Sequence, residues 1–207
     1  PEGRAAALSD GNLGLFAAET GTLFNAQTRA VRIFKEWLGT DKISETAKDS
    51  NIYPDFAGAK AALEAETTQF LSAAVTSGAA GGGSLTELLG GDWSMVNAPL
   101  ANLYGVSLPN ATNDAFVRVS LPHRLGILNQ GAFLSVFAHA HETAPVLRGV
   151  AVMRRVACIP VASPVDLAMA VVPPLPDPTK TTRSRFTTHA TPACAGCHNQ
   201  IDSFGFS

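Results

Sequence analysis

Apolar residues recur at helical spacing along much of the chain. Between Asn25 and Leu38 they fall three or four positions apart, at Val31, Phe34 and Leu38, and Gly39 then acts as a stop signal. The same spacing predicts further helices over residues 56–75, 96–103, 128–137 and 146–157. The pattern therefore predicts a mainly α fold.

Shorter signals add detail to this outline. The helix over residues 56–75 is expected to bury one face, made of Leu63, Phe70, Leu71 and Ala74. Ser84 and Glu87 can form a capping box, in which each side chain accepts a bond from a free backbone N–H at the start of a helix. Residues 116–119 alternate apolar with polar and predict a short strand. The first thirty residues and residues 78–83 lack such patterns, so we expect loop there, with at most one short helix near the N-terminus.

Prolines change the character of the chain after Cys158. They are Pro160, Pro164, Pro173, Pro174, Pro176 and Pro178. Because each proline removes a backbone donor, this stretch resists both helix and sheet and predicts a connector. We therefore expect a helical domain over residues 1–157, followed over residues 158–207 by a proline-rich connector and a C-terminal segment. That segment should pack on the helical domain and continue beyond residue 207 in the full-length protein.

The bulk composition excludes some functional classes. The chain has 207 residues, of which 46% are hydrophobic and 15% are charged, and its formal net charge is −2. This balance predicts a folded protein, and the absence of a basic stripe argues against a nucleic-acid partner. No apolar run approaches the ~18 residues that a transmembrane helix needs. Residues 1–18 do not resemble a secretory signal, and the first residue is not Met, so we interpret the chain as a mature or trimmed piece.

The chemistry is concentrated near the C-terminus, in the motif Cys194-Ala195-Gly196-Cys197-His198. This is the CxxCH pattern of c-type haem attachment. On a helix the two cysteines and the histidine share one face, so the thiols can reach two vinyl groups of one porphyrin while His198 points to the iron. Thr191 and Pro192 suit the start of that helix. The motif predicts one covalently bound haem c, with Cys194, Cys197 and His198 as its ligating residues.

Other uses of these cysteines stay open. Cys194 and Cys197 could form a disulfide or a redox dithiol, or they could bind zinc together with His198 and a distant histidine. An iron–sulfur cluster is disfavoured because there is no second CxxC pair to complete four thiolates. Cys158, the third cysteine, is expected to be a buried free thiol, or to pair with a cysteine in a continuation of the chain.

The chain resembles a family of large multidomain exported proteins from planctomycetes, myxobacteria and their relatives, which carry paired domains of unknown function next to a cytochrome c motif. The resemblance covers residues 26–207 and rests on residues 34–39, 92–97, 103–105, 124–128, 143–149, 189–198, 201–202 and 204–206. It implies haem binding and a periplasmic or extracellular location in the cell envelope, but it defines no reaction. Ala144 departs from the serine that is common in the family.

The second axial ligand of the haem is a separate question. His139 is a candidate because it lies where the family often has a histidine. The other candidates are His123, His141, His189, Met95, Met153 and Met169. His189 lies nine residues before His198, which is a short span for reaching the opposite face of a haem.

We therefore predict a single-haem electron carrier that works with a redox partner protein, within a larger chain or complex. No catalytic residue is predicted. One alternative is a haem peroxidase or oxidoreductase with an open axial site. Another is a cell-envelope module that binds a partner or polysaccharide and carries the haem as an accessory group.

Overall fold

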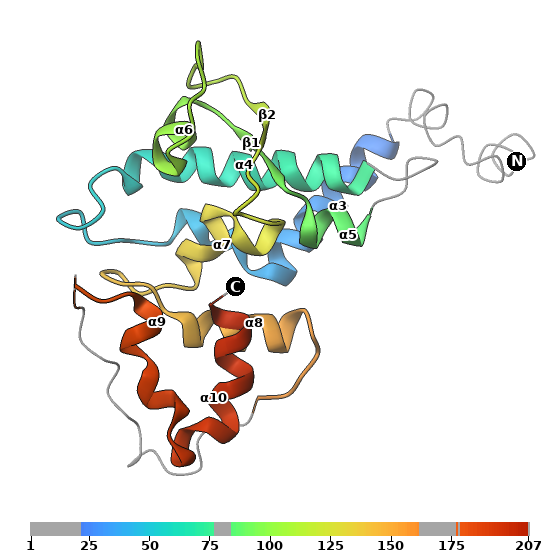
Figure 1. Ribbon diagram of the computed structural model, residues 1–207. Coiled ribbons are helices and arrows are strands. Elements are labelled where there is room, and N and C mark those ends of the chain that lie inside the picture. Colours follow the sequence, from blue (N-terminus) through green and yellow to red (C-terminus); the bar gives the residue numbers. More distant parts are fainter. Residues whose placement is uncertain (1–21, 77–83, 162–176, 178, 207) are drawn as a thin grey trace, which may run out of the picture. The chain divides into compact units, whose positions relative to one another are not determined.

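The computed structural model describes residues 22–76, 84–161, 177 and 179–206, which form two compact units (Figure 1). Unit 1 consists of the described residues of Pro1–Thr46 and Pro54–Val136, and unit 2 of those of Ala47–Tyr53 and Phe137–Ser207. The mainly α prediction is confirmed. Of the first thirty residues, expected as loop with at most one short helix, residues 22–30 belong to α3, and residues 1–21 lie outside the described residues, as do residues 78–83 and most of the proline tract. None of the described helices is long and apolar enough to cross a membrane.

Unit 1 contains most of the predicted helices and one small sheet. Its elements are α3 (Thr22–Leu38), η1 (Thr40–Ser44), α4 (Phe56–Thr76), α5 (Leu85–Gly90), β1 (Trp93–Val96), α6 (Ala98–Tyr104), β2 (Val117–Ser120), η3 (Ile127–Asn129) and α7 (Gly131–Val136). The inner face predicted for α4 is confirmed, since Leu63, Phe70, Leu71 and Ala74 are all at most 2% exposed. The single helix predicted over residues 128–137 is instead a 3₁₀ turn followed by α7, because the backbone of Gln130 is extended.

The capping box before α5 forms only in part. The Ser84 hydroxyl accepts a bond from the Glu87 N–H at 3.2 Å, as predicted. The carboxylate of Glu87 does not return the bond; it accepts instead from the indole N–H of Trp93 and from Arg118, the latter at 3.1 Å. The Ser84 N–H donates to Ala74 O at 3.3 Å. The bonds to Trp93 and Arg118 therefore replace the bond that the Glu87 side chain would make to the Ser84 N–H in a complete capping box.

The two-stranded sheet was only half predicted. β2 agrees with the strand expected near residue 117, and it pairs antiparallel with β1, with Trp93 opposite Ser120 and Val96 opposite Val117. The helix predicted to start at Val96 starts two residues later, at Ala98, because the Asn97 side chain caps α6 by accepting from the Leu100 N–H at 3.3 Å. The four residues of β1 do not alternate regularly between apolar and polar, so their sequence alone predicts no strand. They form a strand by pairing with β2.

Unit 2 is built around the packing of α8 (Pro145–Arg155) against α10 (Pro192–Gly205), with α9 (Thr182–Arg185) and η5 (Thr187–Ala190) beside α10. The division between the units falls after Val136, whereas the composition places a boundary after residue 157. The reason is that α8, which precedes the proline tract, packs with the C-terminal helix that follows it.

Glycines allow α8 and α10 to approach at backbone contact. A Cβ at Gly149 would overlap the carbonyl oxygen of Ile201, and a Cβ at Gly205 would overlap that of Pro145. Arg148 binds the end of α10, since its Nε and Nη2 donate to Gly205 O at 3.1 and 2.9 Å. Burial lowers the pKa of Arg148, yet a guanidinium stays protonated, and a cation at a helix C-terminus is favourable. The C-terminal end of α10 is therefore held firmly on α8.

Cys158 follows the end of α8 in a left-handed turn with φ of 55°. The Ile159 N–H donates to Met153 O at 2.8 Å across this turn. The prediction that Cys158 is buried is wrong: it is an exposed free thiol, because the turn that ends the helix lies at the surface.

Candidate functional site

The CxxCH motif forms the first turns of α10. Pro192 occupies the first turn, as predicted, and Thr191 is the N-cap, although its side chain makes no capping bond. The Thr191 carbonyl accepts from the N–H groups of Cys194 and Ala195, both at 2.9 Å. Cys194 is partly buried and Cys197 exposed, and both are free thiols. The helix therefore presents two unpaired, accessible sulfurs one turn apart, followed by His198.

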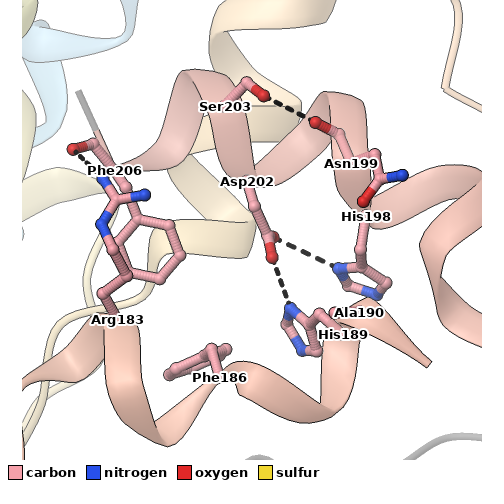
Figure 2. Close-up of a pocket in the computed structure, with 9 residues that line it drawn as sticks. All are labelled: Arg183, Phe186, His189, Ala190, His198, Asn199, Asp202, Ser203 and Phe206. Carbon is pink, nitrogen blue, oxygen red and sulfur yellow. Dashed lines mark hydrogen bonds and ion pairs between the residues drawn. The ribbon is translucent and has the colours of Figure 1, made fainter.

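His198 belongs to a cluster of three side chains that the motif alone does not reveal. Figure 2 shows the imidazoles of His189, from η5, and His198 next to each other, each directed at one oxygen of the Asp202 carboxylate. His189 Nδ1 lies 2.8 Å from Asp202 Oδ2, and His198 Nδ1 lies 3.3 Å from Asp202 Oδ1. The two rings are tilted by 34° with centroids 3.8 Å apart. One ligand atom from each residue can be chosen so that all lie within 4.8 Å of one another.

The cluster lines a pocket of about 250 Å³ between α10 and the α9–η5 segment. The lining residues are Arg183, Phe186, His189, Ala190, His198, Asn199, Asp202, Ser203 and Phe206 (Figure 2). Phe186 meets His189 and Phe206 edge-on, with centroids 4.9 and 5.9 Å apart. The Arg183 guanidinium lies 4.6 Å from the centre of the Phe206 ring. The pocket thus combines aromatic walls, one guanidinium and two imidazoles.

The structure does not bring His139 to this pocket. His139 is exposed on the turn between α7 and α8, and the Lys48 ammonium donates to the carbonyls of Ala138 and His139, both at 2.8 Å. Its ring faces that of His141, with centroids 6.4 Å apart. Neither histidine is among the residues that line the pocket with His198. The assignment of His139 as a distal haem ligand stays a prediction.

The other candidates for the second haem ligand lie in different parts of the structure. Met153 is 3% exposed in α8 and belongs to the core of unit 2. Met95 and His123 belong to unit 1, and Met169 lies outside the described residues. His189 packs against His198, with ring centroids 3.8 Å apart, and the expectation that its span is too short to reach the opposite face of a haem stays a prediction.

The sequence reasoning missed the role of Asp202. A signal for it exists, since His198 and Asp202 are four residues apart and share a face of any helix that contains both. No such local signal exists for His189, because it precedes α10 and reaches the carboxylate only through the turn after η5.

A helix that carries CxxCH in a mainly α unit is a feature of c-type cytochrome domains, and the comparisons with known proteins are in keeping with this class. Residues 124–207 match the family model PSCyt3, described as a protein of unknown function (DUF1588), and residues 22–106 match PSD4, described as a protein of unknown function (DUF1592). The name PSCyt3 suggests a cytochrome-type domain, while its description leaves the function unknown. No curated protein and no solved structure matches the chain.

Proposed function

We propose that this chain is a c-type cytochrome domain that carries one haem c, bound through Cys194, Cys197 and His198. The observation that carries the proposal is the order of the three side chains along α10, at positions i, i+3 and i+4. That order directs two thiols and one imidazole to the same face of a helix. A bound haem supplies one-electron redox chemistry there.

The chemistry of the donor set fits this cofactor. Both thiols are free and reachable from solvent, so each can form a thioether with a vinyl group. The His198 ring is 25% exposed, and its Nδ1 faces Asp202. Its Nε2 is therefore the nitrogen left for iron, since a ligating histidine commonly donates its other ring N–H to a carboxylate or carbonyl.

The pocket beside His198 also supports the proposal that haem binds here. Phe186 and Phe206 provide apolar surface against which part of a porphyrin can pack. Arg183, at the edge of the pocket, can pair with a haem propionate in the bidentate manner of guanidinium and carboxylate groups. The protein's contribution is then to bind the haem, hold its orientation and supply a fixed axial imidazole.

We further propose that the domain transfers electrons in the periplasm or elsewhere in the cell envelope, together with a redox partner protein. The support is the cytochrome-type name of the matching family model and the resemblance to exported haem proteins.

The test is production of the chain in the periplasm of a host with haem-attachment machinery. We expect the intact mass to rise by one haem and a denaturing gel to stain for haem. Cys194→Ser with Cys197→Ser should abolish the staining, and His198→Ala should leave attachment weak and any remaining haem high-spin. Cys158→Ser is the matched control, because this exposed cysteine lies outside the motif and its loss should change nothing.

A wild-type chain with zinc, a disulfide or an unmodified mass would overturn the proposal. The absorption spectrum then decides between carrier and enzyme. A low-spin, six-coordinate haem in both oxidation states supports electron transfer, whereas an open site with peroxide turnover would indicate an oxidoreductase.

A further inference from the structure

The Asp202 carboxylate contacts two neighbouring imidazoles, those of His189 and His198. Each carboxylate oxygen faces a different ring, with Oδ2 at 2.8 Å from His189 Nδ1 and Oδ1 at 3.3 Å from His198 Nδ1. All three side chains are largely buried, with exposed fractions of 13% for His189, 25% for His198 and 20% for Asp202. The arrangement is therefore a built cluster rather than a surface encounter.

The hydrogen bonding assigns the tautomers. A carboxylate can only accept, so each Nδ1 that faces Asp202 carries the proton and donates it. In a neutral imidazole with its proton on Nδ1, the lone pair lies on Nε2. The carboxylate thus selects, in His198, the one tautomer whose Nε2 can bind a metal.

Other polar groups around the pocket have partners of their own. The Ser203 hydroxyl donates to Asn199 O at 2.6 Å, and Arg183 Nη2 donates to Phe206 O at 3.2 Å. His189 contributes by packing, because its ring lies against that of His198 and meets Phe186 edge-on. The carboxylate is consequently the group that directs the His198 ring.

We propose that Asp202 is the positioning residue for the haem ligand: it fixes the tautomer and orientation of His198 and raises the basicity of its Nε2, while His189 holds the same carboxylate in place through its other oxygen. This proposal rests on the proposed haem function. A second-sphere hydrogen bond of this kind strengthens the ligand and stabilises the oxidised metal, so it lowers the reduction potential.

The experiment compares the haem-bound wild-type chain with Asp202→Ala and Asp202→Asn. Asn has one acceptor oxygen where Asp has two, and its amide group would point an N–H donor at one of the imidazoles. Asp177→Asn is the matched control, since Asp177 is a partly exposed carboxylate of the same unit whose side chain bonds to Thr179 and is remote from the cluster in the sequence.

Two readouts are measured. The midpoint potential should shift in the positive direction in both Asp202 variants and stay unchanged in the control. The iron–histidine stretching frequency, recorded on the ferrous haem just after photodissociation of carbon monoxide, should fall in the same two variants. The stretching frequency depends on the hydrogen bond that His198 Nδ1 donates. A loss of negative charge at a distance from that bond would not alter the frequency.

The result that overturns the proposal is a wild-type stretching frequency in both Asp202 variants, whatever happens to the potential. If Asp202→Ala does not fold, Asp202→Asn decides alone, because it keeps the size of the side chain. Absence of covalent haem in the wild-type chain would refute the proposed function instead. The tautomer is then read by ¹⁵N NMR of the imidazoles, and a His198 protonated on Nε2 would refute the positioning role independently.

Discussion

Glu66 gives the sharpest test of the energetics of unit 1. This residue of α4 is fully buried, in the middle of the face formed by Leu63 and Phe70. Its Oε1 accepts from the Ser94 hydroxyl and its Oε2 from the Tyr104 hydroxyl, both at 2.6 Å. A carboxylate in this position loses its hydration, and two hydroxyl donors compensate for only part of that loss.

Burial raises the pKa of Glu66 to about 7 from its usual 4.5, against the opposing influence of the Ser94 and Tyr104 hydrogen bonds and the charge of Arg124. The folded state therefore holds the proton more tightly than the unfolded state does. At about 1.4 kcal/mol per pKa unit, the displacement corresponds to about 3 kcal/mol. This stabilisation is fully present below pH 4.5, where both states are protonated, and is lost as the pH rises through about 7.

The perturbation is Glu66→Gln, which removes the ionisation but keeps the size of the side chain. We expect the wild type to lose about 2.5 kcal/mol of unfolding free energy between pH 5 and pH 8 through this group, and the variant to lose none of it. Since the Gln amide turns a donor towards one hydroxyl, the variant should also lose about 1 kcal/mol at every pH. The two proteins should then be about equally stable at pH 5, and the variant should be the more stable by about 2 kcal/mol at pH 8.

The assay is urea unfolding at several pH values, followed by tryptophan fluorescence. It reports on unit 1 because both tryptophans of the chain, Trp37 and Trp93, lie there. Titration of histidines cancels in the difference between the two proteins. Glu64→Gln is the control, because Glu64 lies on the same helix, is 43% exposed and pairs with Lys35. A stability difference between wild type and Glu66→Gln that is constant from pH 5 to pH 8 would refute the reasoning.

Two further substitutions test the packing and the capping. Gly149→Ala should destabilise unit 2 by about 3 kcal/mol, because the added Cβ would overlap the Ile201 carbonyl and force α8 away from α10; a loss below about 0.5 kcal/mol in thermal unfolding would contradict the close helix contact. Gly58→Ala is its control, since the space around Gly58 is open, and it should gain up to about 1 kcal/mol from helix propensity. Ser84→Ala should cost about 1 kcal/mol through the loss of the bond to the Glu87 N–H, measured by urea unfolding, and an unchanged midpoint would show that this cap is not needed.

The predictable part of this protein is the part that depends on near neighbours in the chain. Helical spacing located α3, α4 and α8, because the residues that share a helix face are three or four positions apart. Capping chemistry located the start of α5, and Pro192 the start of α10. The CxxCH prediction is of the same kind, since its three side chains lie within five consecutive residues.

Other features were decided by tertiary contacts. β1 exists because β2 pairs with it, and Glu87 gave up its local capping bond for Trp93 and Arg118. Glu66 lies on the inner face of α4, and its burial is made tolerable by the hydroxyls of Ser94 and Tyr104, which only the folded chain brings to it.

The candidate site also combines features set by neighbours in the chain with features set by tertiary contacts. The sequence by itself determined which side chains α10 offers, since their spacing is a property of one helix. The pairing of His198 with Asp202 is local too, since the two residues are four positions apart on α10. Only the folded chain decided that His189 meets them, and that His139 lies elsewhere on an exposed turn. The physical reason is that residues within one helix have their spacing set by the sequence, whereas His189 belongs to a preceding segment that only packing brings to the carboxylate.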